Sequence, residues 1–400
     1  MTSQLKGLTV LEFSHTIMGP CAGLLLADLG ADVIKIEPAP AGDHTRQLPG
    51  FAAGFFATFN RNKRSVAIDL KTESGRKVLY RLVESADVVI ENYGPGTMER
   101  LGCGWETLSE KNPRLVYLAL KGFLAGPWQD RPALDEVVQF QSGLAYMTGP
   151  PGQPLRAGAS VIDILGAVFG VTGVLAALRE RDHSGKGQRV SSALFESAVF
   201  LMAPHMAASA TSGEVIPPMT ARRGAWGIYD VFALADDQQI FIGVTSDAQW
   251  ERFCTEFEFN DLFADKRLST NALRSKERDW LIPTLKERLS SLSFDNAQAL
   301  SERADISWSP VGRPEDLFTN DHLLCGQGLI TTALNTAAGT LIDETLLPSL
   351  PLEFGRNKTR PTLVRQPPEI GEHTTEVLRT SGLSVADINA LIKEGVVSGN

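Results

Sequence analysis

Metal-binding and disulfide patterns are absent from this sequence. The chain contains four cysteines, which lie far apart at Cys21, Cys103, Cys254 and Cys325. Their spacing excludes a CxxC metal signature and a dense disulfide framework. The six histidines are scattered as well, with no HxxxH or HExxH pair. We therefore expect no metal site, and we expect reduced thiols of the kind found in cytoplasmic proteins.

Positive charge is not in excess either. The 38 lysines and arginines face 47 aspartates and glutamates, which gives a formal net charge of −9 and a pI of about 5.3. Proteins that bind nucleic acid more often carry a basic surface, so this balance disfavours a nucleic-acid partner. A net acidic chain can still carry the local basic patch that a phosphate-bearing ligand needs.

Long apolar runs are also scarce. Residues 1–7 contain no apolar core of signal-peptide length. The most apolar stretch, 158–178, is interrupted by Asp163 and by glycines. The mean hydropathy of the chain is −0.05 and no second apolar span is present, so we interpret this stretch as a buried core helix. These observations predict a cytoplasmic protein that does not span a membrane.

The first half of the chain alternates short apolar runs with amphipathic stretches. The apolar runs, which have the length and composition of buried strands, are residues 8–13, 32–36, 65–70, 86–91 and 115–120. Helical spacing is found between them at 21–29 and 72–85. Strands separated by helices predict an α/β fold with a mostly parallel sheet covered on both faces.

The pattern changes in the second half. A hairpin is indicated at 228–244, where two apolar runs flank the polar turn ADDQ. The prolines and polar residues just before it indicate a linker between domains. We therefore predict a large α/β domain at 1–212 that is completed by 330–400, a linker at 213–224, and a smaller α+β domain at 225–325.

Basic and amide side chains follow several of the predicted strands. They are Lys35, Arg46, Asn60, Arg61, Lys63, Arg64, Asn92, Arg100 and Lys121. The carboxyl ends of strands form the ligand crevice of an open α/β sheet, and cations there suit phosphates. The turn at 14–20 does not match GxGxxG, which argues against a dinucleotide. For each basic residue the alternative is a solvated surface charge.

Two carboxylates stand out near the middle of the chain. Asp163 lies in the apolar sequence VIDIL, although carboxylates are rarely buried unless they are paired or used. By itself this pattern favours a helix-start or salt-bridged aspartate over a catalytic one. Asp135 begins a helical stretch, where a negative charge suits the helix dipole.

Several ordered segments carry a family resemblance. They include GLTVLEFSHTIMGP, KGFLAGP, RPALDEVVQ and PPEIGEHTTEVL, and together they cover residues 7–46, 60–71, 91–102, 121–127, 131–139 and 367–378. These segments resemble the class III CoA-transferases of the CaiB/BaiF type, a family of carnitine and formyl-CoA transferases and α-methylacyl-CoA racemases. The resemblance implies a large Rossmann-like domain, a small domain and a homodimer of two interlocked chains.

The resemblance also implies a chemistry. It places the family's nucleophilic aspartate at Asp163 and gives Asp135 a supporting role. The implied reaction moves CoA between carboxylic acids through an aspartyl anhydride and an aspartyl-CoA thioester, with no tightly bound cofactor. The residues that we expect to bind CoA are His15, Thr16, Ile17, Lys35, Asn60, Lys63, Asn92, Tyr93, Arg100 and Lys121.

Departures from the family pattern narrow the expected activity. The racemases carry a histidine where this chain has Leu134, and a leucine cannot transfer a proton. We therefore favour a transferase, with a racemase and a non-catalytic acyl-CoA-binding subunit as alternatives. Formate- and oxalate-specific transferases carry a glutamine where this chain has Ile17, which disfavours oxalate as a substrate.

The acceptor that we expect is a C4–C5 dicarboxylate such as itaconate, mesaconate, citramalate, malate or glutarate. Succinyl-CoA is the expected donor. Three arginines are candidates to bind the distal carboxylate of such an acid: Arg156, Arg222 and Arg223.

Overall fold

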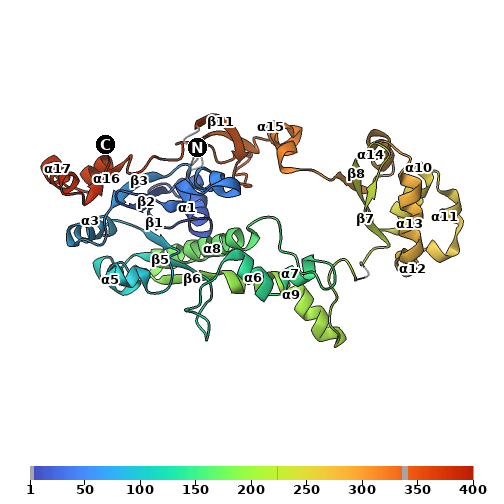
Figure 1. Ribbon diagram of the computed structural model, residues 1–400, viewed down its shortest axis with the longest axis horizontal. Coiled ribbons are helices and arrows are strands. Elements are labelled where there is room, and N and C mark those ends of the chain that lie inside the picture. Colours follow the sequence, from blue (N-terminus) through green and yellow to red (C-terminus); the bar gives the residue numbers. More distant parts are fainter. Residues whose placement is uncertain (1–3, 223, 336–340, 400) are drawn as a thin grey trace. The chain divides into compact units, whose positions relative to one another are not determined.

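The computed structural model describes residues 4–222, 224–335 and 341–399. It divides the chain into two compact units (Figure 1). One unit comprises Met1–Ile216 and Asp321–Asn400, and the other comprises Pro217–Asn320. The first of these boundaries falls inside the segment predicted as a linker, and the second lies a few residues before the predicted end of the small domain.

The first unit is built on a seven-stranded sheet of order β12-β3-β2-β1-β4-β5-β6. Its strands are β1 (Thr9–Phe13), β2 (Asp32–Pro38), β3 (Arg64–Ile68), β4 (Val88–Glu91), β5 (Val116–Lys121), β6 (Arg189–Ala193) and β12 (Val397–Ser398). β1 to β6 pair in parallel, and β12 joins β3 antiparallel. The central strand order is that of dinucleotide-binding folds, and the predicted α/β class with a mostly parallel sheet is confirmed.

Alternate residues of each strand point to opposite faces of this sheet, and each face carries its own core. Leu11 and Phe13 of β1 face one cluster, whereas Val10 faces the other. The first face is covered by α3 (Glu73–Val83), α5 (Trp105–Lys111), α16 (Thr374–Thr380) and α17 (Val385–Lys393). The second is covered by α1 (Met18–Asp28), α6 (Asp135–Gln141), α8 (Val161–Ser184) and α9 (Leu194–Ser212).

Helix α8 is the apolar stretch singled out in the sequence. Among the described residues it is the one helix long and apolar enough to cross a membrane. Its inner face packs on β5 and β6, where a side chain at Gly170 would lie within 2.8 Å of Leu120. Near its end Arg181 pairs with Asp87 at 2.9 Å. The inner face is therefore core, while Ile164 on the outer face is 40% exposed.

The sequence did not indicate strand β6. Its sequence, RVSSA, is short and half polar, so it lacks the apolar run used to recognise the other strands. β6 exists because β5, already buried on both faces, offers it a free edge for pairing. The pairing also closes the sheet beside α8.

The second unit has a three-stranded antiparallel sheet of β7 (Ile228–Ala233), β8 (Gln239–Val244) and β9 (Ser307–Pro310). The predicted hairpin at 228–244 corresponds to β7 and β8. Its helices are α10 (Asp247–Glu256), α11 (Asn260–Ala264), α12 (Asn271–Lys276), α13 (Arg278–Leu289) and α14 (Phe294–Arg303). Trp250, Phe253 and Leu285 are central to its separate core.

The remaining elements of the first unit are short or peripheral. They are α2 (Phe55–Asn60), α4 (Thr97–Arg100), α7 (Leu144–Thr148), α15 (Asp321–Cys325), β10 (Leu329–Asn335) and β11 (Leu341–Pro348). β10 and β11 pair only with each other among the described residues, as a separate antiparallel ribbon.

Candidate active site

A cavity of about 570 Å³ opens at the carboxyl ends of β1, β4 and β5, beside the start of α8. It brings together nine of the residues predicted for the site: His15, Thr16, Ile17, Asn92, Tyr93, Lys121, Asp135, Arg156 and Asp163. These residues come from six separate places in the chain. Their convergence at the carboxyl edge of a parallel sheet is where such folds bind ligands.

The turn between β1 and α1 forms one wall. Asn92 holds it in both directions, because its Oδ1 accepts the His15 N–H at 3.0 Å and its Nδ2 donates to the His15 carbonyl at 2.9 Å. The next residue, Thr16, has a φ of 66°, a left-handed conformation that non-glycine residues rarely adopt. A side chain at Gly19 would come within 2.4 Å of Ser14. The backbone conformation of this turn is therefore fixed by hydrogen bonds and close packing.

His15 lines this cavity and also a second one of about 440 Å³. The His15 ring stacks on Tyr93 with a centroid distance of 5.6 Å and tilts against His44 at 4.8 Å. Burial lowers the pKa of His15, and the charge of His44 lowers it further. The second cavity has apolar walls that include Ile36 and Leu101.

Asp163 lies in the first turn of α8, and its carboxylate is one of the acids lining the main cavity. Its backbone N–H donates to Oδ2 of Asp135 at 3.0 Å. Burial raises the pKa of Asp163 to about 7, and the nearby charges of Asp135 and Glu136 contribute to the rise. No ion pair of Asp163 with an arginine or lysine is found within the described parts of the chain.

Two cations sit at the rim with carboxylate partners. Lys121 Nζ pairs with Glu91 at 2.5 Å and donates to the Tyr93 carbonyl at 2.9 Å. Arg156 pairs with Glu136 at 3.1 Å, and both side chains are almost half exposed. Both cations line the cavity, so they can reach an anionic ligand there.

The sequence did not single out Arg131, which also lines the cavity. Its guanidinium lies over the Trp128 ring at 5.2 Å from the centroid, and it has no carboxylate partner in the described ranges. Arg131 is the first residue of RPALDEVVQ, one of the segments that carry the family resemblance, and this position could have indicated a role in the site. Arg131 is thus a further cation suited to an anionic substrate.

Three predicted CoA-binding residues are placed elsewhere. Lys35, Asn60 and Lys63 are fully buried and line neither of the two cavities. Lys63 Nζ contacts Glu12 at 2.6 Å, the Pro20 carbonyl at 2.9 Å and Asn60 Oδ1 at 3.0 Å. Lys35 pairs with Asp43 at 3.0 Å. The prediction of direct CoA contacts by these side chains is wrong, because their charges and polar atoms are satisfied internally.

Three further arginines were predicted for the site: Arg100, Arg222 and Arg223. Arg100 is exposed, donates to Thr97 Oγ1 at 2.8 Å and lines neither cavity, so its contact with CoA stays a prediction. Arg222 is exposed and belongs to the second unit, and its contact with a substrate carboxylate stays a prediction. Arg223 lies outside the described residues.

Comparison with known proteins decides the family. Residues 5–374 match the family described as CoA-transferase family III. The chain belongs to this family. As a family III CoA-transferase it is an enzyme that acts on CoA thioesters and carboxylic acids.

Relatives of this CoA-transferase cover nearly its whole length. The succinyl-CoA:mesaconate CoA-transferase of Haloarcula hispanica is 32% identical and aligns over 95% of this chain and 96% of its own. The succinate–glutarate CoA-transferase of Agrobacterium fabrum is 32% identical over 94% of each chain. A solved CaiB/BaiF family protein from Brucella suis superposes with a TM-score of 0.82 at 29% identity, covering 95% of this chain and 100% of that one.

The raised pKa of Asp163 predicts how stability depends on pH. The folded state holds this proton to a higher pH than the unfolded state, so the contribution of the group to stability falls as pH rises towards about 7. Asp163→Asn removes that loss. The free energy of unfolding of the variant minus that of the parent should therefore increase by roughly 2 kcal/mol between about pH 5 and pH 8. Urea unfolding at each pH measures this difference.

Asp261 supplies the control for this measurement. Hydrogen bonds from Arg288 lower the pKa of Asp261 to about 2, so it stays ionised throughout that interval. Asp261→Asn should therefore show no such slope. A flat profile for Asp163→Asn would show that Asp163 is not held above its usual pKa.

Proposed function

We propose that this enzyme transfers CoA from succinyl-CoA to a C4–C5 dicarboxylate, with Asp163 as the nucleophile. One observation carries the proposal. Asp163 places a largely buried carboxylate in the wall of the main cavity, and this carboxylate has no cationic partner among the described residues. Burial strips water from a carboxylate, which favours its attack on a thioester and protects an anhydride from hydrolysis.

The proposed route needs no metal or redox cofactor. A carboxylate oxygen of Asp163 bonds to the thioester carbonyl carbon, the C–S bond breaks, and CoA leaves as a thiolate with the electron pair. The thiolate then attacks the aspartyl carbonyl carbon of the mixed anhydride, which releases the first acid as a carboxylate. The second acid reverses these steps on the aspartyl-CoA thioester. No proton or electron is gained or lost overall.

Two cavities that share His15 and Tyr93 in their walls support a binding mode for CoA. The apolar second cavity, with Lys71 at its edge, suits an adenine ring and a neighbouring phosphate. From there the pantetheine arm would pass His15 and Tyr93 into the main cavity. Thr16, Ile17, Asn92 and Lys121 line that path.

Cations in the main cavity support a dicarboxylate as acceptor. Arg131 and Arg156 line the same cavity as Asp163, and a guanidinium group suits the distal carboxylate of a short acid. The relatives named above act on mesaconate or glutarate together with a succinyl group. Leu134, exposed in the same wall, offers no proton-transfer group, so this position does not favour a racemase.

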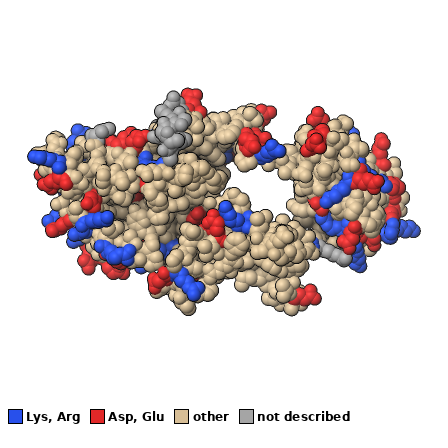
Figure 2. Space-filling model, in the orientation of Figure 1, with Lys and Arg blue, Asp and Glu red and all other residues tan. Residues whose placement is uncertain are grey.

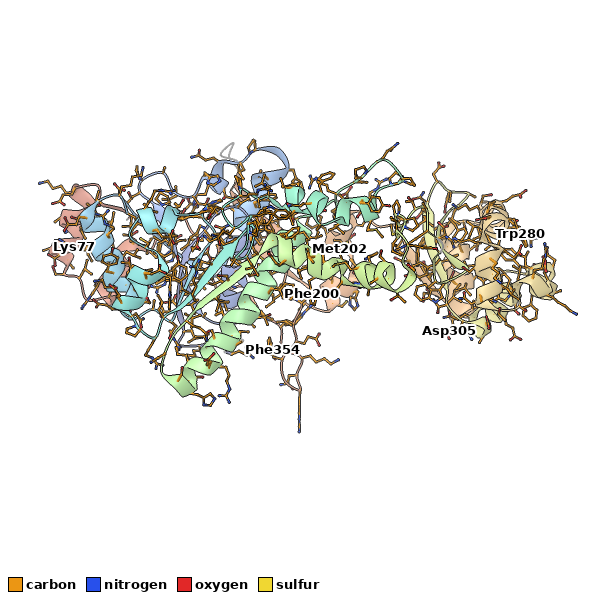
Figure 3. The ribbon with its side chains drawn as sticks, turned by 90° about the horizontal axis from the view of Figure 1, so that it is seen from below. Lys77, Phe200, Met202, Trp280, Asp305 and Phe354 are labelled. Atoms are coloured by element: carbon orange, nitrogen blue, oxygen red, sulfur yellow. The ribbon has the colours of Figure 1, made fainter. Side chains whose placement is uncertain are left out.

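We also propose that a second copy of the chain covers the outer face of α6, α8 and α9. Eight apolar side chains are exposed there: Val137, Phe140, Ile164, Val168, Leu175, Phe200, Leu201 and Met206. Phe200 of α9, which is labelled in Figure 3, packs edge-on against Phe169 of α8 with a centroid distance of 5.2 Å. Figure 2 shows mostly uncharged surface over α7 and α9. An apolar face of this size is typical of an interface.

The four free cysteines, three of them buried, support a place in the reducing cytoplasm. Fractionation of cells that express the chain at its native level would test this location. Recovery in a membrane or exported fraction would contradict it.

Loss of the nucleophile should abolish transfer. Asp163→Ala should lower kcat by about four orders of magnitude or more while CoA affinity stays within roughly threefold, because the carboxylate acts in the chemistry and not in binding. Steady-state kinetics and calorimetry with CoA measure the two effects. With hydroxylamine present, acyl-CoA should leave a hydroxamate on Asp163 of the parent chain, seen by mass spectrometry. Retained turnover, or deuterium uptake at the α-carbon of a 2-methylacyl-CoA without transfer, would reject the transferase mechanism.

Dicarboxylates should be better acceptors than monocarboxylates. With succinyl-CoA as donor, mesaconate or glutarate should exceed butyrate in kcat/KM by at least about tenfold, the value of one charge-assisted hydrogen bond. Arg156→Gln should shrink this ratio, whereas Arg179→Gln, an exposed arginine on α8 outside the cavity, should not. Equal use of butyrate and glutarate would rule out the dicarboxylate assignment.

The purified chain should behave as a homodimer. Sedimentation should give the mass of two chains, and Phe200→Glu should shift it towards one, because a charge would be buried in the apolar interface. A monomeric parent chain would contradict the proposal.

A further inference from the structure

The helix that carries Asp163 is capped by another helix. Ser160 stands at the N-cap of α8 but makes no side-chain capping bond. Instead, Oδ2 of Asp135 on α6 accepts the N–H of Ile162 at 2.7 Å and that of Asp163 at 3.0 Å. The first N–H groups of a helix have no partner within the helix, so these bonds determine where α8 begins.

The second oxygen of Asp135 is also occupied. Gln139, one turn later on α6 and fully buried, donates its amide N–H to Oδ1 of Asp135. The amide oxygen of Gln139 accepts the N–H of Ala157 at 2.8 Å. The Gln139 amide therefore links Asp135 to the segment that leads into α8. Its NH2 group is the donor and its oxygen is the acceptor.

This arrangement leaves Asp135 poorly suited to proton transfer. The side chain is 3% exposed and both oxygens already accept hydrogen bonds from the protein. Three donors thus occupy its two oxygens, and neither oxygen is left open to a reacting group. Its effect on Asp163 is therefore exerted through the backbone of α8 and through its charge.

We propose that Asp135 and Gln139 are positioning residues: together they cap the start of α8, hold the Asp163 carboxylate in its attacking position, and take no proton during the reaction. The inference rests on the proposed role of Asp163 as nucleophile. It assigns to Gln139 a role that its residue type alone does not suggest.

Exchanging the two side-chain types tests the proposal. In Asp135→Asn the new oxygen must accept both α8 N–H groups, so the new NH2 group faces the NH2 group of Gln139. In Gln139→Glu two carboxylates face each other. In the double variant the new amide at position 135 donates to the new carboxylate at position 139, whose other oxygen still accepts from Ala157. Every hydrogen bond is then restored, and the negative charge has moved one helical turn.

Each single variant should lower kcat by about tenfold to a hundredfold, as expected for a displaced catalytic group, with the KM for acyl-CoA nearly unchanged. Each should also lower the unfolding midpoint. The double variant should recover both kcat, to within about tenfold of the parent, and the midpoint. Gln141→Glu, on an exposed residue of the same helix, is the matched control and should change neither.

Two outcomes would overturn the proposal. If the double variant regains the unfolding midpoint but stays as slow as Asp135→Asn, the Asp135 carboxylate itself takes part in the chemistry. If Gln139→Glu keeps the full rate, Gln139 positions nothing. Should a single variant fail to fold, Gln139→Leu, which removes only the amide, must still lower kcat, and an unchanged rate in it would likewise overturn the proposal.

Failure of the proposed function would be visible separately. It would appear as the absence of the hydroxamate on Asp163 in the parent chain, before any of these variants is compared. The unfolding midpoints would still report whether Asp135 and Gln139 cap α8.

Discussion

A buried carboxylate shared by two lysines organises the first unit. Glu12, in the central strand β1, is fully buried and pairs with Lys63 at 2.6 Å and Lys35 at 3.3 Å. Removing one partner from such a cluster leaves an uncompensated buried charge, at a cost of about 3–5 kcal/mol. The lysines also donate to the carbonyls of Ser14 and Pro20, which flank the turn in the cavity wall. That turn is therefore held from inside the protein, and its outer surface is left for a ligand.

The opposite wall depends on a different constraint. There α6 and α8 meet through the buried carboxylate of Asp135. Partial burial raises the pKa of Asp163, and the nearby charge of Asp135 raises it further. Burial and a neighbouring negative charge both make an unpaired anion costly, and a carboxylate under these conditions is a stronger nucleophile towards a thioester. The same burial that protects a reactive anhydride thus reduces the stability of the folded chain above neutral pH.

The basic residues show where reasoning from sequence was insufficient. Lys63 and Lys121 both lie near a strand of the same sheet, yet one is fully buried and the other lines the cavity. The difference arises because Lys63 meets Glu12, and because Gly23 leaves room for that carboxylate: a Cβ there would lie 1.7 Å from Glu12 Oε2. Glu12, Gly23 and Lys63 are separated along the chain, so no local pattern connects them.

The sequence by itself determined the α/β class, the position of most strands, the family and the candidate nucleophile, because these depend on hydrophobic periodicity and on ordered motifs that persist along the chain. Tertiary structure alone decided which charges face the cavity and which neutralise each other, that Asp135 caps α8, and that Arg131 joins the site. The physical reason is that burial and pairing are properties of groups brought together from distant segments, and they appear only when the chain is folded.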